Sequence, residues 1–212
     1  KKSIYFYIRV ESIQNISNIN NLLDLDYPFN NSTFHFINLT SSSIKNDIIE
    51  LKKKYPYCIL LSNITNEIEY SVDLFRTLHK FDHLFIGNID HVIEDKNVLQ
   101  LLITRNRGFV APLLIKKSNP LFSNFWGDVD ENGFYKRSSD YLDICNRKKL
   151  GIWSVAYLSA SILVNTKRLD YMLKKWDKCC KSDFDIYFSN IIILYYNLLY
   201  LDNYKFYGYI LD

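Results

Sequence analysis

The sequence of residues 83–90 is His-Leu-Phe-Ile-Gly-Asn-Ile-Asp, a mainly apolar stretch with polar residues near its end. Its apolar part is short, so it predicts a buried strand that ends in the polar pair Asn88 and Asp90. Side chains at positions i and i+2 of a strand lie on the same face. At the carboxyl edge of a parallel sheet, two such oxygen-bearing side chains can hold a divalent cation that binds a diphosphate. Asn88 supplies an uncharged oxygen, so we expect weaker metal binding than two carboxylates would give.

Strand and helix signals alternate on both sides of this stretch. Strands rich in β-branched and aromatic residues are predicted at 4–10, 33–39, 57–62, 83–89 and 109–115. Helical spacing is found at 18–25, 44–54, 67–80, 97–106 and 184–194. Strands separated by helices of about 10 residues form a parallel sheet that is covered on both faces. We therefore predict an α/β fold with a Rossmann-type, mostly parallel sheet that binds its ligands at the carboxyl ends of the strands.

Composition limits the class of protein. The 212 residues are 48% hydrophobic and 23% charged, which suits one compact domain with a sizeable core. The net charge of +3 is small and the Lys and Arg residues are dispersed, so no nucleic-acid partner is indicated. The longest apolar run, 191–201, contains Asn197 and is shorter than the roughly 20 residues of a membrane span. Neither a signal peptide nor an initiating Met is visible at the start, so we expect a domain excised from a larger protein.

Common cofactor and catalytic motifs are absent from the sequence. It contains no G-x-G-x-x-G, no Gly-Lys-Ser/Thr phosphate loop and no G-x-S-x-G nucleophile motif. The histidines form no H-x-D or H-E-x-x-H pair, so no iron site is expected in this chain. A structural role is favoured for each histidine, at positions His35, His79, His83 and His91.

The four cysteines lack the spacing of metal ligands. Cys58 lies in the apolar run 57–61, where a buried free thiol is the favoured interpretation. Adjacent Cys179 and Cys180 can pair with other cysteines, but the spacing does not determine how they would be connected.

A second acidic pair, Asp183 and Asp185, stands at the start of the last apolar helix. Carboxylates at a helix N-terminus act as caps, which is the favoured structural interpretation. The functional alternative is a catalytic or acceptor-binding role for one of these carboxylates.

Several sequence blocks after Asp90 resemble those of a known family. They are Val110-Ala111-Pro112-Leu113-Leu114, Ser123-Asn124-Phe125-Trp126-Gly127 and Phe134-Tyr135-Lys136-Arg137-Ser138-Ser139-Asp140-Tyr141. Together they resemble a block shared by procollagen lysyl hydroxylases and procollagen galactosyltransferases. Residues 151–157, Gly-Ile-Trp-Ser-Val-Ala-Tyr, are more similar to the hydroxylase version, Gly-Val-Trp-Asn-Val-Pro-Tyr. Residues 183–185 and 206–208 fall where those hydroxylases carry Asp-Pro-Asp and Glu-Phe-Gly. The likeness is strong over 81–169, fair over 182–208 and one of pattern before residue 81.

The resemblance implies a single GT-A glycosyltransferase-like domain over residues 1–212. In lysyl hydroxylases this block belongs to a central accessory domain, between an N-terminal glycosyltransferase domain and a C-terminal Fe(II)/2-oxoglutarate oxygenase. In the galactosyltransferases, the similar domain is associated with transfer of galactose from UDP-galactose to hydroxylysine with Mn²⁺. Asn88 and Asp90 stand on the D-x-D acids of the family, and Asp183 and Asp185 stand on its later acidic pair. The departure at Asn88 puts metal binding and activity in doubt.

The same resemblance suggests partners and a location. It implies collagen or procollagen peptide and the neighbouring glycosyltransferase and oxygenase domains as partners, in the endoplasmic reticulum lumen or secretory pathway. Some large DNA viruses carry collagen-modifying enzymes of this kind, and the many residues with A/T-rich codons fit such a source.

Within the shared blocks, the large aromatic residues Trp126 and Trp153 have two interpretations. Core packing is favoured over sugar stacking or an interdomain contact, because a large aromatic side chain buries some 150–250 Å². Asn124 and Asp140 either orient an acceptor or satisfy backbone groups in turns.

Three functional hypotheses follow. The first is an accessory domain with weak or no activity, which positions neighbouring domains or collagen peptide. The second is an active Mn²⁺-dependent hexosyltransferase that acts on hydroxylysine or galactosyl-hydroxylysine. In it Asp90, helped by Asn88, would hold the metal on the UDP diphosphate, and Asp183 or Asp185 would contact the acceptor hydroxyl. The third is a GT-A fold used only for protein contacts.

Overall fold

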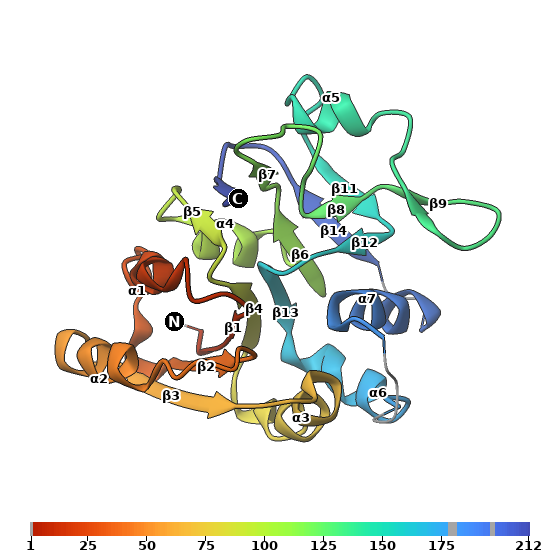
Figure 1. Cartoon of the computed structure of the whole chain (residues 1–212). Coiled ribbons are helices and arrows are strands. Elements are labelled where there is room, and N and C mark those ends of the chain that lie inside the picture. Colours follow the sequence, from red (N-terminus) through yellow and green to blue (C-terminus); the bar gives the residue numbers. More distant parts are fainter. Residues whose placement is uncertain (1, 178–181, 196–197) are drawn as a thin grey trace.

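The computed structural model describes residues 2–177, 182–195 and 198–212. Within them, an eight-stranded sheet forms the centre of the molecule, in the order β11-β14-β6-β13-β4-β1-β2-β3 (Figure 1). The strands, in chain order, are β1 (Ile4–Val10), β2 (Thr33–Asn38), β3 (Cys58–Asn63), β4 (His83–Asn88), β6 (Phe109–Pro112), β11 (Ile152–Val155), β13 (Ile162–Asn165) and β14 (Leu199–Asp202). The predicted α/β class is confirmed.

Two of these strands, β13 and β11, run antiparallel to their neighbours, while β1, β2, β3, β4, β6 and β14 share one direction. β13 lies between β4 and β6 and begins directly after Ala160 and Ser161, whose φ angles are 50° and 51°. Residues other than glycine seldom adopt a positive φ. This reversal of the chain therefore has no signal in the sequence, which explains why the antiparallel strand was not predicted.

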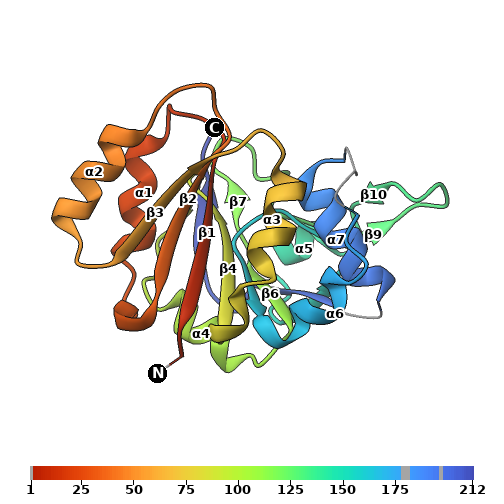
Figure 2. The ribbon, with the colours of Figure 1, turned by 90° about the horizontal axis from the view of Figure 1, so that it is seen from below.

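Helices cover both faces of the sheet (Figure 2). On one face lie α1 (Ile19–Leu23), α2 (Lys45–Lys54) and α4 (Val98–Thr104). On the other lie α3 (Glu67–Phe75), α5 (Tyr141–Cys145), α6 (Leu169–Leu173) and α7 (Phe184–Leu194). The alternation of side chains along β1 separates the two cores, since Phe6 packs with the first group and Tyr7 with the second.

Short elements surround the main sheet. β5 (His91–Ile93), β15 (Gly208–Ile210) and β7 (Ile115–Lys116) form a small sheet, and β8 (Phe125–Trp126) pairs with β12 (Tyr157–Leu158). β9 (Asp128–Val129) and β10 (Tyr135–Lys136) form a hairpin that projects beside α7. Single 3₁₀ turns occupy η1 (Ile16–Asn18), η2 (Phe29–Asn31), η3 (Leu78–Lys80) and η4 (Thr166–Arg168).

Three sequence-based expectations need correction. The predicted strand 109–115 is divided between β6 and β7, which belong to different sheets. The predicted helix 67–80 consists of α3 and the separate 3₁₀ turn η3. Cys58 is exposed and not buried, because its apolar run forms the outermost strand of the sheet. Cys179 and Cys180 lie outside the described residues. None of the helices in the described part of the chain has the length and hydropathy to span a membrane.

Gly208 is a position where only glycine fits. Its φ is +151°, and a Cβ atom placed there would lie 1.9 Å from the carbonyl oxygen of Val92 in the paired strand. This glycine ends the Phe206-Tyr207-Gly208 block that was singled out in the sequence.

We expect Gly208→Ala to lower the free energy of unfolding by more than about 2 kcal/mol, because the added methyl group would collide with backbone. Gly133→Ala is the matched control. Gly133 has a φ of +85° but no heavy atom near its Cβ position, so it should lose only about 1 kcal/mol. Urea denaturation measures both, and equal losses for the two variants would contradict the interpretation.

Candidate functional site

The carboxyl ends of β1 and β4 lie side by side, since Arg9 of β1 is in register with Asn88 of β4. From there the chain continues to Glu11 and Asn15 after β1, and to Asp90 after β4. This edge is where α/β sheets of this kind bind ligands. The structure thus brings the predicted pair Asn88 and Asp90 to the predicted edge.

The polar atoms of this pair are engaged in hydrogen bonds. Asn88 Oδ1 accepts from the backbone N–H of Asp90 at 2.9 Å, and Asn88 Nδ2 donates to Oε2 of Glu11 at 2.8 Å. Asp90 Oδ1 accepts from Asn15 Nδ2 at 2.8 Å. Asn88 is buried, with 7% of its surface exposed. The two hydrogen bonds fix the orientation of its side-chain amide.

Mn²⁺, which the resemblance implies at this place, prefers oxygen ligands and above all carboxylates. Asp90 is the single carboxylate of the pair, and the oxygen of Asn88 is already bonded to a backbone amide. Among the residues that the structure describes, no three His, Cys, Asp or Glu side chains are grouped so that they would hold a metal ion. The donor set therefore does not fit a D-x-D type of metal site.

A buried arginine, Arg9, occupies the centre of the edge, with 3% of its surface exposed. Its guanidinium lies 2.5 Å from Glu11 Oε1, 2.9 Å from Glu67 Oε1 and 2.8 Å from Asp185 Oδ2. The ring of Phe184 lies against it, with the ring centroid 5.2 Å from the guanidinium carbon. We call Arg9, Glu11, Glu67 and Asp185 the Arg9 cluster.

Sequence reasoning missed Arg9, Glu11 and Glu67. One signal was available, because Arg9 is the single charged residue in the apolar stretch 4–10, and a charge in a buried strand requires partners. The sequence does not show which carboxylates pair with Arg9, since Asp185 follows it 176 positions later.

The later acidic pair divides between two roles. Asp183 caps α7, because its Oδ1 accepts from the backbone N–H groups of Asp185 and Ile186. Asp185 is buried and accepts from Arg9 and from Ser159 Oγ at 3.2 Å. Its other oxygen, Oδ1, is buried without a hydrogen-bond partner among the described residues.

Burial and charge shift the ionisation of the groups at this edge. Desolvation by burial raises the pKa of Glu67 to about 7. The positive charge of Arg9 lowers this pKa, but by less than burial raises it, and the nearby carboxylates of Asp185 and Glu11 raise it further. Burial lowers the pKa of His91 to about 3, and the charge of Arg9 acts in the same direction. His91 is therefore neutral, with Nδ1 2.9 Å from Ser161 Oγ.

The remaining motif residues have structural contacts. Asn124 is fully buried and bonds the backbone N–H of Leu114 and the carbonyl of Pro112. Asp140 accepts from Ser138 Oγ just before α5. Asn124 thus satisfies two backbone groups that are 10 and 12 positions away, and Asp140 makes a local contact between side chains.

The two tryptophans of the shared blocks are half-buried. Trp153 packs against the core on the side of α7 and donates from its indole N–H to Asn203 at 3.0 Å. Trp126 stacks on Tyr141, with Arg137 over its ring. Both tryptophans thus make contacts with neighbouring side chains.

Solved glycosyltransferases of the GT-A class share this fold. GalNAc-T7 with UDP, GalNAc and Mn²⁺ superposes with a TM-score of 0.67 at 10% identity, covering 100% of this chain and 44% of that one. S. aureus TarS in complex with UDP-GlcNAc gives 0.62 at 14% identity, covering 100% and 59%. At these identities the likeness establishes the fold, which is GT-A glycosyltransferase-like.

Residues 62–212 match the family described as glycosyltransferase family 25, N-terminal domain, and the chain belongs to this family. It is 33% identical over 161 residues to procollagen-lysine,2-oxoglutarate 5-dioxygenase 2 of Mus musculus, which covers 71% of this chain and 21% of that protein. It is 30% identical over 174 residues to the human multifunctional procollagen lysine hydroxylase and glycosyltransferase LH3, covering 77% and 23%.

The family resemblance identified from the sequence blocks is confirmed by these matches. The chain spans about a fifth of the length of the curated relatives it matches. The relatives named here are animal proteins, so the viral source suggested by composition has no support from them.

The raised pKa of Glu67 predicts a pH dependence of stability. Between pH 4.5 and 7 the unfolded chain loses the Glu67 proton while the folded chain keeps it, so the free energy of unfolding falls as the pH rises. Buried His35, His83 and His91 have lowered pKa values and produce the opposite slope below about pH 6.5. The difference between a variant and the wild type is therefore the quantity to measure.

We expect Glu67→Gln to gain stability relative to the wild type by up to about 3 kcal/mol as the pH rises from 4.5 to 7.5, because glutamine cannot ionise. Urea denaturation at several pH values measures this gain. Glu69→Gln, an exposed position on the same helix, controls for removing a carboxylate from α3. If the difference in free energy of unfolding between Glu67→Gln and the wild type does not change with pH, burial does not raise the pKa of Glu67.

Proposed function

We propose that this domain is a GT-A-type accessory domain of a collagen-modifying enzyme, which transfers no sugar itself and positions neighbouring domains or collagen peptide. One observation carries the proposal. At the strand end where a D-x-D pair would hold a metal, Asn88 replaces a carboxylate and uses its oxygen on the amide of Asp90. A metal that stabilises the leaving diphosphate needs free anionic oxygens.

The Arg9 cluster supports the same proposal. A hexosyltransferase would need Asp183 or Asp185 to contact an acceptor hydroxyl. Asp183 instead accepts two backbone bonds of α7, and Asp185 is buried against Arg9. Releasing Asp185 would leave a buried guanidinium with one partner fewer, at a cost of several kcal/mol.

The partners and the location belong to this proposal. The relatives are named for procollagen lysine modification and are several times longer than this chain. We therefore propose collagen or procollagen peptide and the glycosyltransferase and oxygenase domains of a longer protein as partners, in the lumen of the endoplasmic reticulum.

Calorimetric titration with UDP-glucose and UDP-galactose, with and without Mn²⁺, tests the proposal. We expect no Mn²⁺-dependent binding of either nucleotide sugar by the wild-type chain. Submillimolar binding that requires Mn²⁺, together with transfer of hexose to a hydroxylysine or galactosyl-hydroxylysine peptide, would establish an active transferase instead.

The variant Asn88→Asp tests whether the missing carboxylate at position 88 limits metal binding. It restores a second carboxylate beside Asp90, so we expect its affinity for Mn²⁺ to exceed that of the wild type by at least about tenfold. Asn97→Asp adds the same charge at an exposed position before α4 and should leave the affinity unchanged. An equal gain in both variants would mean that net charge, and not this site, governs Mn²⁺ binding.

A further inference from the structure

The outermost strand β3 has an open side. β2 pairs with one side of β3, and within the described residues no strand lies on the other. Its sequence, Cys-Ile-Leu-Leu-Ser-Asn, contains no charged residue and no proline. Natural sheets protect such edges with lysine, proline, a bulge or a covering element. An uncharged, six-residue edge is therefore suited to receive another strand.

The free backbone groups of this edge can be assigned. The N–H of Ile64, just after β3, donates to the carbonyl of Asn38 in β2 at 3.1 Å. Backbone groups of alternate residues in a strand point to the same side. The N–H and C=O groups of Ile59, Leu61 and Asn63 therefore point away from β2, toward the open side.

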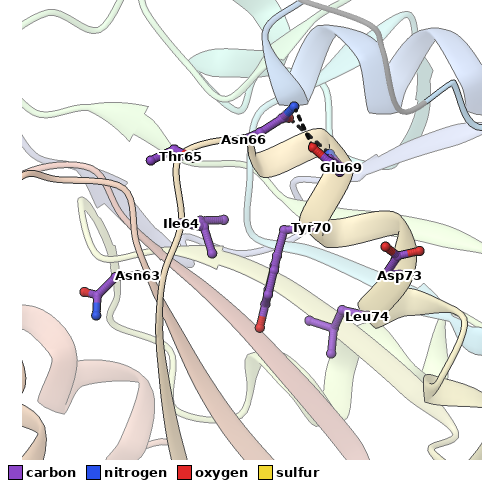
Figure 3. Close-up of a pocket in the computed structure, with 8 residues that line it drawn as sticks. All are labelled: Asn63, Ile64, Thr65, Asn66, Glu69, Tyr70, Asp73 and Leu74. Carbon is purple, nitrogen blue, oxygen red and sulfur yellow. Dashed lines mark hydrogen bonds between the residues drawn. The ribbon is translucent and has the colours of Figure 1, made fainter.

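An acidic cavity of about 480 Å³ flanks the end of β3 on the face covered by α3 (Figure 3). Glu69 and Asp73, both exposed, line it together with the ring of Tyr70. Glu69 accepts a hydrogen bond of 3.3 Å from Asn66, and Asp73 lies 3.5 Å from Arg76. Two carboxylates one helical turn apart give this cavity a negative character.

A basic cavity of about 540 Å³ flanks the same strand along α2. Exposed Lys45 and Lys52 line it with Ile49, and Leu61 of β3 lies on the same face of the sheet as α2. The acidic residues of α2, Asp47 and Glu50, line a different cavity. The side of α2 that borders β3 is thus positive and apolar.

We propose that the open edge of β3 binds an extended segment of a partner protein that has lysine or arginine on one face and aspartate or glutamate on the other. α2 and α3 lie on opposite faces of the sheet (Figure 2). Side chains of an added strand alternate between these faces. Backbone hydrogen bonds to Ile59, Leu61 and Asn63 supply affinity, and the two cavities select the charge of alternate side chains.

A second copy of this chain fits the edge less well. If β3 pairs antiparallel with β3 of a second copy, the twofold axis is perpendicular to the sheet. Each helix then lies on the same face as the equivalent helix of the other copy. Lys45 and Lys52 of α2 would then face the same lysines, and Glu69 and Asp73 of α3 the same carboxylates. Like charges in such positions are repulsive.

Two synthetic ten-residue peptides of identical composition test the proposal with the 212-residue chain. In the segregated peptide, all lysines lie on one face of the strand and all glutamates on the other. Valines fill the remaining positions, which are the same in both peptides. The mixed peptide carries both charges on each face, and no shift of register makes the two equivalent. We expect the segregated peptide to bind at least about fivefold more tightly by fluorescence anisotropy.

Hydrogen exchange measured by NMR locates the contact. Binding of the segregated peptide should slow exchange at the amides of Ile59, Leu61 and Asn63. A peptide of the same sequence with proline at its centre should lose this protection, because it cannot continue the ladder.

A charge-reversed variant tests the acidic cavity. The double substitution Glu69→Lys with Asp73→Lys should weaken the segregated peptide about tenfold, while Asp26→Lys with Glu131→Lys changes net charge equally at exposed sites elsewhere. The proposal is overturned if both peptides bind equally, or if the β3 amides stay unprotected. It is also overturned if the chain alone sediments as a dimer with those amides already protected, which would identify a second copy as the occupant.

Discussion

The guanidinium of Arg9 is the constraint on which the carboxyl edge of the sheet depends. Its three carboxylate partners come from separate parts of the chain: the loop after β1, the start of α3 and the first turn of α7. Glu67 and Asp185 both lie where a helix N-terminus favours negative charge. Because a buried charge needs its partners, the Arg9 cluster holds both helices against β1. Internal ion pairs thus occupy part of the carboxyl edge of the sheet.

The first half of the fold follows from local sequence patterns. Residues 4–10 and 83–88 are apolar and rich in β-branched or aromatic residues, and the helices between the strands have the expected spacing. Such signals need no tertiary information. The second half was less predictable, because strands such as β8 and β12 contain two residues each and exist only through pairing. The exposure of Cys58 was missed for a related reason, since an apolar run does not reveal which strand ends up at the edge of a sheet.

The candidate site was predictable only where residues are close in sequence. The pair Asn88 and Asp90 was recognised because positions i and i+2 of a strand lie on one face. The strand in fact ends at Asn88, and Asp90 lies in the turn that follows it. The Arg9 cluster joins positions 9, 11, 67 and 185, and nothing in the sequence relates them. The cap at Asp183 follows from its place before an apolar helix, whereas the ion pair of Asp185 depends on how α7 packs against β1.

The position of β13 has a consequence for the order in which the molecule folds. β4 pairs with β1 on one side and with β13 on the other, where Ile86 of β4 lies opposite Ile162 of β13. During synthesis, the four-stranded unit β3-β2-β1-β4 is therefore complete long before β13 is available, and the β4 edge stays open in the meantime. Contacts of such large sequence separation form slowly, and open strand edges favour aggregation. The open edge of β4 in the N-terminal half is thus exposed to wrong pairing until β13 covers it.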